Sequence, residues 1–268
     1  MTTQVAETAV IDPRAEIDVD VEIGPFCIIG PDVRIGRGTR LENHVTIMGH
    51  VALGVHNHVY PGAVIGGAPQ DLAYQGESTE VQIGDYNVIR EAVTINRATI
   101  KEDGVTVVGD HCYLMATSHV AHDCRLGDRV VLANGVLLGG HVHVNDDATL
   151  SGGVGIHHFG TVGSFSFVGG HSRVLHDVPP FMLVEGSPAR PRCVNVVALK
   201  RSDFPNDVIK ALSETHRLLY RSKVGLDHAR EILRSNGMLI PAVNHLLSFV
   251  QNQHEGRHGR SRERRKAA

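Results

Sequence analysis

Five residues with regular spacing could form an acid–base site. Gly140 follows His122 by 18 residues and His158 follows Gly140 by 18, while His141 follows Asp123 by 18. An imidazole with a pKa of about 6.5 can take a proton from a hydroxyl group at neutral pH. A neighbouring carboxylate can fix its tautomer, and a glycine amide can stabilise an oxyanion. We therefore predict that His122 is catalytic, provided that the fold brings residues 18 apart together.

A hexapeptide repeat predicts this stacking. An aliphatic residue stands at every sixth position of 11–65, 83–95 and 108–174. A period of six fits one short strand plus one turn, and three such units make a triangular coil of 18 residues. The sequence therefore predicts a parallel β-helix whose aliphatic residues form inner columns. Known hexapeptide helices are left-handed, and we expect this hand by resemblance to them.

Interruptions of the repeat indicate how the chain is organised. Residues 66–82 and 96–107 exceed what a repeat needs, so we expect them to form loops outside the prism, where sites commonly lie. After Pro179-Pro180 the repeat stops, and apolar residues follow helical spacing in 208–219, 226–233 and 243–250. The expected domains are a β-helix with its two loops over 1–185, an α-helical domain over 186–255 and a disordered basic tail over 256–268.

Composition limits the classes of partner. The 268 residues are 42% hydrophobic but only 4% aromatic and include no Trp, so aliphatic side chains must fill the core. The formal net charge is −3 and the basic residues concentrate in 257–268, so we expect no nucleic-acid partner. No segment resembles a signal peptide or approaches the length of a membrane span. We expect a soluble, cytoplasmic protein with no integral membrane segment.

Neither a covalent nucleophile nor a metal site is expected. The chain has no G-x-S-x-G motif, and its four cysteines form no C-x-x-C pair. Cys27, Cys112 and Cys124 fall in the small-residue slot of the repeat and should be buried. Carbonic anhydrases of the gamma type bind zinc through three His of a β-helix, but their pattern requires a His at the position of Gly163. We therefore favour direct, base-assisted transfer without a cofactor.

Six motifs are longer and more specific than the hexapeptide. They are IGDYNVIREAVTINRAT at 83–99, LMATSHVAHDCRLGDRVVLAN at 114–134, LGGHV at 138–142, DVPPF at 177–181, EGSPAR at 185–190 and ALKR at 198–201. With them the chain resembles the UDP-N-acetylglucosamine O-acyltransferase family, from about Ile11 into the C-terminal helices. The bare hexapeptide, in contrast, is shared by many unrelated acyltransferases.

This resemblance implies a homotrimeric enzyme of lipid A synthesis with active sites between neighbouring prisms. Family members transfer an (R)-3-hydroxyacyl group from acyl carrier protein to the sugar 3-hydroxyl of UDP-N-acetylglucosamine. By resemblance His122 is the general base, Asp123 orients it and the Gly140 amide holds the oxyanion. The resemblance also implies a sugar contact by Asp71, a nucleotide site near Asn195 and Arg201, and an acyl-groove limit at Gly170. The remaining expected substrate-binding residues are His119, His141, His157 and His158.

Three departures from the family pattern concern substrate binding. Ala73 stands where Lys is frequent, His158 replaces a frequent Gln, and Ser202 replaces a second Arg. The acceptor therefore stays open between a 3-hydroxyl and a 3-amino sugar. The acyl length is also open, although Gly170 leaves room for a longer chain. Basic residues that count as candidates for docking the carrier protein are Arg90, Arg97, Arg129, Arg173, Lys200 and Lys210.

Two other functions are compatible with a hexapeptide β-helix. One is the N-acyltransferase that acts later in the same pathway, but that family usually carries an extra N-terminal uridine-binding domain. Here the repeat already starts at Ile11. The other is a scaffold or binding module without catalysis, which predicts that replacing His122 affects stability alone.

Overall fold

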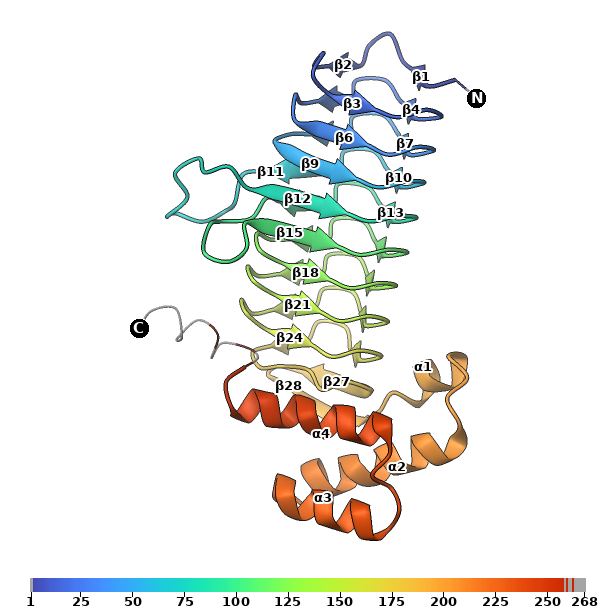
Figure 1. Cartoon of the computed structure of the whole chain (residues 1–268), viewed down its shortest axis with the longest axis vertical. Helices are drawn as coiled ribbons and strands as arrows, with labels where there is room; N and C mark the ends of the chain where they lie inside the picture. The colour runs from blue at the N-terminus through green and yellow to red at the C-terminus, as the bar shows by residue number, and fades with distance from the viewer. Residues whose placement is uncertain (1, 258, 260–261, 263–268) are drawn as a thin grey trace.

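Three sheets form the faces of a triangular prism, and helices cover its C-terminal end (Figure 1). The structure, a computed structural model, describes residues 2–257, 259 and 262. The strands are short, and most contribute one outward residue and one aliphatic residue that points into the prism, as His119 and Val120 do. The inward residues of successive coils form continuous buried columns, which confirms the predicted parallel β-helix.

Within the coils each sheet takes every third strand, and the first sheet ends with β27 and β28. The first sheet contains β1 (Gln4–Val5), β4 (Glu22–Ile23), β7 (Arg40–Leu41), β10 (His58–Val59), β13 (Val88–Ile89), β16 (Tyr113–Leu114), β19 (Val131–Leu132), β22 (Thr149–Leu150), β25 (Phe167–Val168), β27 (Met182–Gly186) and β28 (Ala189–Val194). The second contains β2 (Val10–Ile11), β5 (Ile28–Ile29), β8 (Thr46–Ile47), β11 (Val64–Gly67), β14 (Thr94–Asn96), β17 (His119–Val120), β20 (Leu137–Leu138), β23 (Gly155–Ile156) and β26 (Arg173–Val174). The third contains β3 (Glu16–Ile17), β6 (Val33–Ile35), β9 (His50–Leu53), β12 (Glu80–Ile83), β15 (Val105–Val108), β18 (Arg125–Leu126), β21 (His143–Val144) and β24 (Thr161–Val162).

Strand register shows where the two insertions fall. His119 pairs with Leu137 and Leu137 with Gly155, so a regular coil advances by 18 residues. Val64 pairs with Thr94, 30 residues later, and Thr94 pairs with His119, 25 residues later. The extra residues form the segments 68–79 and 97–104, which project together from one edge of the prism (Figure 1).

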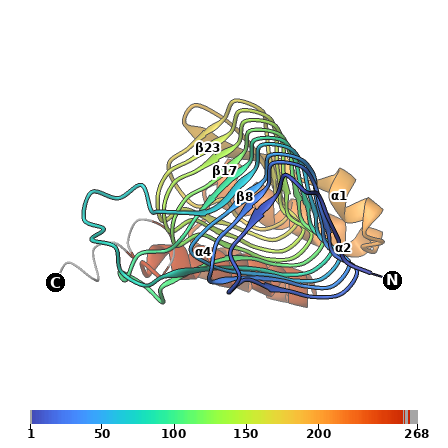
Figure 2. The same cartoon turned by 90° about the horizontal axis from the view of Figure 1, so that it is seen from above.

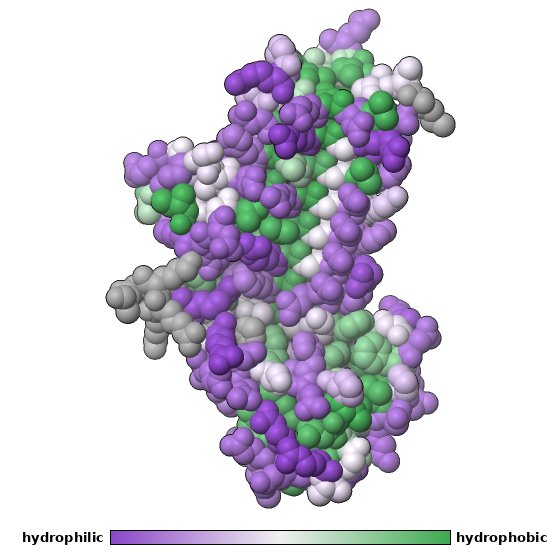
Figure 3. Space-filling view, viewed as in Figure 1, coloured by the Kyte–Doolittle hydropathy of each residue, from purple (hydrophilic) through white to green (hydrophobic). Residues whose placement is uncertain are grey.

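The coil is left-handed. In Figure 1 the strands of the third sheet face the viewer and run from left to right, while the chain descends from the N-terminus and returns behind them. The view from above shows the triangular outline formed by the stacked coils (Figure 2). In the space-filling view, apolar residues form a band along this front face with polar residues on both sides (Figure 3).

The core contains aliphatic side chains, as the composition predicts. Cys27, Cys112 and Cys124 are buried in it, and burial raises the pKa of each thiol, so the prediction for these three residues is confirmed. The turns between strands repeatedly place one residue in the left-handed region, including Asp123 at φ 60° and His141 at φ 62°. This backbone geometry turns the chain sharply and stacks the turn residues of successive coils.

An antiparallel hairpin of β27 and β28 ends the prism and leads into the helices. These are α1 (Val196–Arg201), α2 (Asn206–His216), the π-helical turn η1 (Arg217–Arg221), α3 (Leu226–Ser235) and α4 (Pro241–His254). The buried residues Leu212, Leu233 and Leu246 lie on the predicted apolar faces. The repeat pattern did not predict the hairpin or α1, because neither has a hexapeptide or a long apolar stripe.

Part of the expected basic tail packs against the prism. Arg262 donates hydrogen bonds to the carbonyls of His141 (2.5 Å) and Phe159 (2.9 Å) and contacts the His143 ring. Positions 258, 260–261 and 263–268 of this tail lie outside the described residues. Among the residues that the structure describes, no helix is long and apolar enough to span a membrane.

Candidate active site

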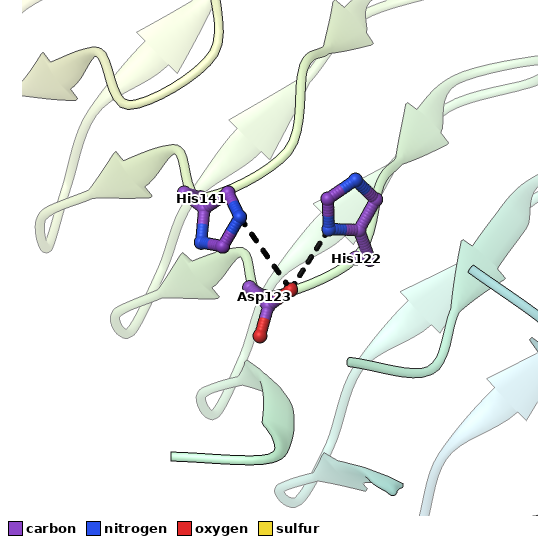
Figure 4. A group of neighbouring side chains, drawn as sticks. All are labelled: His122, Asp123 and His141. Carbon is purple, nitrogen blue, oxygen red and sulfur yellow. Dashed lines mark hydrogen bonds and ion pairs between the residues drawn. The ribbon is translucent and has the colours of Figure 1, made fainter. Parts of the chain in front are cut away.

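The turn between β17 and β18 holds a His–Asp pair. His122 Nδ1 lies 2.8 Å from Asp123 Oδ2, and the two side chains are 12% and 1% exposed (Figure 4). Because the carboxylate accepts, this geometry places a proton on Nδ1 and leaves the lone pair on Nε2. The pair therefore has the orientation that a histidine general base requires.

Two threonines hold Asp123, one at its carboxylate and one at its backbone amide. Its Oδ2 accepts hydrogen bonds from the Thr99 amide at 3.0 Å and the Thr99 hydroxyl at 2.8 Å. The Asp123 amide donates to Thr106 Oγ1 at 2.9 Å. Thr99 belongs to the second insertion and Thr106 to β15, so two neighbouring segments hold the residue that orients His122. Three hydrogen bonds, two from Thr99 and one from His122, meet at the buried Asp123 Oδ2.

Gly140 lies directly against the His122 ring. A Cβ at this position would come within 2.4 Å of His122 Cε1 and 2.6 Å of Nε2, so no larger residue fits without displacing the imidazole. Among the described residues, the Gly140 N–H donates no backbone hydrogen bond, whereas the next amide, of His141, donates to the His122 carbonyl at 3.0 Å. The Gly140 amide beside the imidazole thus remains available to an oxyanion.

A pocket of about 440 Å³ opens beside this pair. The lining combines polar side chains, among them His119, His122 and Arg173, with the apolar side chains of Leu137 and Leu175. This arrangement suits a ligand with a polar reacting end and an aliphatic body. The lining residues are Gln70, His119, Ala121, His122, Leu137, Leu138, Gly139, Gly140, Gly155, Ile156, His157, Arg173, Val174 and Leu175.

His119 and His157, both expected to bind substrate, line this pocket with His122. The Thr94 hydroxyl lies 2.7 Å from His119 Nδ1. Burial, and secondarily the nearby His122, lower the pKa of His119, so its neutral form is favoured. The His157 ring packs against the ring of His158 with centroids 3.8 Å apart. His158 itself is not among the residues that line the pocket.

His141 lies behind the pocket rather than in its wall. It is 4% exposed and stacks on Phe159 with ring centroids 4.3 Å apart. Its Nδ1 is 3.1 Å from Glu102 Oε2, and its Nε2 is 3.7 Å from Asp123 Oδ2. His141 and His122 thus face the same carboxylate oxygen, and their rings lie edge to face with centroids 5.1 Å apart (Figure 4).

Asp71 joins the two insertions. Its carboxylate forms an ion pair with Lys101, and its Oδ1 accepts a hydrogen bond from the Ala73 amide at 2.9 Å. The Lys101 hydrogen bond is the main cause that lowers the pKa of Asp71, and the charge of His122 also contributes. The carboxylate thus lies within electrostatic range of the dyad, while its neighbour Gln70 reaches the pocket.

Asn195 and Arg201 lie on a different face of the prism from His122. They line a second pocket of about 490 Å³ that lies against the first sheet and α1. Asn195 caps α1 through the Ala198 amide and donates to the Phe165 carbonyl at 2.9 Å. Gly170 lines neither pocket and faces the Gly152 carbonyl across 3.4 Å from its Cβ position. A single chain therefore does not bring all of the expected residues into one cavity.

Several site residues were not predicted. Thr99, Glu102 and Lys101 lie in the second insertion, where the repeat gives no register, so their neighbours could not be assigned from spacing. Thr94 could have been found, because it pairs with His119 from the preceding, enlarged coil.

The three residues drawn in Figure 4 also offer metal-ligand atoms. Those atoms of His122, Asp123 and His141 all lie within 4.8 Å of one another. However, Asp123 Oδ2 already accepts from Thr99 and faces the Nδ1 of His122. Hydrogen bonding therefore explains the cluster, and we propose no metal role for it.

The β-helix and its His–Asp pair at a pocket edge together define a transferase of the hexapeptide-repeat class. A model described as bacterial transferase hexapeptide matches residues 15–49 and 106–140. A second model, described as UDP N-acetylglucosamine O-acyltransferase, domain 2, matches residues 177–259.

Similar proteins identify the family within this class. The acyl-carrier-protein–UDP-N-acetylglucosamine O-acyltransferase of Burkholderia orbicola is 44% identical over 258 residues, 95% of this chain and 98% of the relative. That of Gloeothece citriformis is 46% identical over 74% of this chain and 71% of the relative. This chain belongs to the UDP-N-acetylglucosamine O-acyltransferase family, and the resemblance seen in the sequence is confirmed.

Solved structures agree. The UDP-N-acetylglucosamine acyltransferase of Bacteroides fragilis superposes with a TM-score of 0.90 at 33% identity, covering 93% of this chain and 97% of the other. The UDP-N-acetylglucosamine O-acyltransferase of Moraxella catarrhalis gives 0.88 at 40% identity, covering 94% and 97%. The similarity therefore spans both the prism and the helices.

Proposed function

We propose that this enzyme transfers an (R)-3-hydroxyacyl group from acyl carrier protein to the 3-hydroxyl of UDP-N-acetylglucosamine, the first step of lipid A synthesis. The observation that carries this proposal is the His122–Asp123 pair with its Nε2 beside the Gly140 amide, at a pocket with an apolar wall. The relatives named above act on the same two substrates according to their names. The proposal keeps the cytoplasmic location expected from the sequence.

The proposed chemistry is a direct acyl transfer. His122 Nε2 takes the proton of the sugar hydroxyl as its oxygen attacks the thioester carbonyl carbon. The carbonyl oxygen becomes an oxyanion, which accepts a hydrogen bond from the Gly140 amide. When the intermediate collapses, the carbon–sulfur bond breaks and the imidazolium returns its proton to the leaving thiolate. Asp123 stabilises the imidazolium in between and holds its tautomer.

Two features support the assignment of the substrate ends. The apolar side chains of Leu137, which is exposed, and Leu175 line the pocket and suit the aliphatic part of the acyl group. Lys101, paired with Asp71, brings a cation to the first insertion, where Ala73 replaces the Lys that is frequent in the family. We propose that Asp71 contacts the sugar and that Lys101 supplies the positive charge near the diphosphate.

The complete site forms between copies of the chain in this proposal. His122 and Arg201 line pockets on different faces of one prism. If one such face of each chain contacts the other face of the next chain, and successive chains are rotated by a third of a turn, three chains close into a ring. Leu72, next to Asp71, is fully exposed and apolar, as expected of a contact to a second copy. We therefore propose a homotrimer with the nucleotide held by the neighbouring chain.

Mixed oligomers test this arrangement. His122→Ala and Arg201→Ala chains should each be strongly impaired alone, yet co-expressed oligomers should regain activity at about a quarter of their sites, because random mixing pairs intact halves at that frequency. Sites built within one chain would regain nothing, and that outcome would overturn the shared-site proposal.

The reaction itself is tested with a panel of 3-hydroxyacyl carrier proteins and UDP-N-acetylglucosamine. Wild-type protein should form the O-acyl product, and His122→Ala should lose about 10²- to 10⁴-fold of the rate while keeping its fold and oligomeric state. Product formed only with the 3-amino analogue would change the acceptor assignment. Equal rates of the wild type and the His122 variant would refute the general-base role.

A further inference from the structure

A third hollow lies among the C-terminal helices, away from the two pockets described above. Its volume is about 520 Å³, and it lies between the end of β28, helix α2 with η1, and the segment after α3. Val194, Val196 and Met238 form apolar parts of its wall. The other lining residues are Cys193, Lys210, Ser213, Glu214, His216, Arg217, Arg221 and Asn236.

The wall contains a buried imidazole, that of His216, with one nitrogen that has no hydrogen-bond partner among the described residues. His216 is 5% exposed, and this nitrogen is its Nε2. The Pro191 carbonyl favours the protonated ring, whereas burial and the charge of Arg221 disfavour it and lower the pKa of His216. The ring is therefore neutral and its unpaired nitrogen is sealed from solvent, so His216 forms part of the wall and leaves the ligand contacts to its neighbours.

The backbone departs from an α-helix at this place. The five residues Arg217–Arg221 form a π-helical turn directly after His216, the last residue of α2. Such turns are rare and occur frequently at functional sites. This one displaces Arg217 and Arg221 relative to a continued α-helix, and both line the hollow.

Charge favours an anion here. Lys210, Arg217 and Arg221 contribute three cations against one carboxylate, that of Glu214. Arg217 is engaged with Glu214 at 2.7 Å and 2.8 Å. Lys210 and Arg221 are exposed, so their positive charges can balance the negative charge of a bound ligand.

We propose that this hollow binds a phosphate monoester with an apolar body. The phosphate oxygens accept hydrogen bonds from Lys210 and Arg221, and the apolar body lies on Val194 and Met238. The proposal does not depend on the acyl-transfer assignment, because none of these residues lines the His122 pocket.

Cys193 provides a local reporter. It lines the hollow and is exposed, whereas Cys27, Cys112 and Cys124 are buried. Alkylation of Cys193 by N-ethylmaleimide, followed by mass spectrometry of the intact protein, therefore detects occupancy here and ignores ligand bound elsewhere. The probe is n-hexyl phosphate, compared with inorganic phosphate and n-hexanol.

We expect n-hexyl phosphate to slow the alkylation of Cys193 in a saturable manner, inorganic phosphate to act more weakly, and n-hexanol to have no effect. The Lys210→Ala/Arg221→Ala protein should need about 100-fold more probe, because two charge-assisted hydrogen bonds are lost. Arg234→Ala, which removes an exposed cation outside the hollow, should behave like the wild type.

No protection of the wild type, or equal protection of the double variant, would overturn the proposal. His122→Ala protein should show unchanged protection, which separates this result from any failure of the proposed acyl transfer.

Discussion

Replacing Gly140 by Ala tests the site most directly, because the structure gives the size of the disturbance. The added Cβ would lie 2.4 Å from His122 Cε1, whereas ordinary contacts begin at 3.4 Å. The imidazole must therefore retreat by about 1 Å, and a displacement of about 1 Å in a catalytic geometry can cost about 10²-fold in rate. We expect kcat to fall about 100-fold, equivalent to about 2.7 kcal/mol of barrier.

Backbone strain is not expected to contribute, because Gly140 is not among the glycines with positive φ. The Gly140→Ala protein should thus unfold close to the wild-type temperature and keep its oligomeric state. The assay is steady-state transfer from 3-hydroxyacyl carrier protein, with thermal unfolding measured alongside. Gly225→Ala serves as the matched control, because a Cβ there meets nothing within 4 Å and the residue begins α3, outside both pockets.

A second variant shows whether the loss acts through His122. In a His122→Ala background, Gly140→Ala should cost little more, because the displaced imidazole is already absent. Full activity of Gly140→Ala would refute the reasoning that a rigid glycine holds the base in position. Additive losses would show instead that Gly140 acts separately, through its amide alone.

Three further variants follow from the buried charges. Asp123→Asn should lower kcat about 10³- to 10⁴-fold, because the amide cannot hold the His122 tautomer; a loss below about 10-fold in the steady-state rate would contradict this. Burial raises the pKa of Asp177 to about 6, above its usual 3.8, so folding loses stability as pH rises through this interval. At pH 7.5 the free energy of unfolding of Asp177→Asn should therefore exceed that of the wild type by at most about 3 kcal/mol, and the variant should unfold at a higher temperature. At pH 4 the two proteins should unfold at the same temperature. Arg262→Ala removes two hydrogen bonds to backbone carbonyls and should cost about 1–3 kcal/mol in chemical denaturation, whereas the exposed control Arg257→Ala should cost little.

Most of the prism could be predicted from the residues alone. A strict period of six leaves few solutions, because each unit must be one strand and one turn, and three units must close a coil. The stacking of Gly140 on His122 and of His141 on Asp123 follows from the same count. His122 and Asp123 are adjacent in the sequence, so the local geometry of the turn is enough to bring their side-chain atoms into contact.

Elements outside the repeat could not be predicted in the same way. Lys101, Glu102 and Thr99 contact the site from a segment without register, so only the folded loop shows that they support Asp71, His141 and Asp123. The hairpin of β27 and β28 and the short helix α1 also lack a periodic signal. Their position depends on packing against the last coil rather than on local propensity.

The sequence by itself determined the repeat, its stacking and the position of the His122–Asp123 pair within it, because these depend on spacing within a rigid periodic scaffold. Tertiary structure alone decided that His141 is buried behind the dyad and that Asn195 and Arg201 lie on another face. It also decided that His216 is buried with an open nitrogen at a cationic hollow. The physical reason is that spacing fixes neighbours one coil apart, whereas contacts of loops and helices depend on packing between segments that share no period.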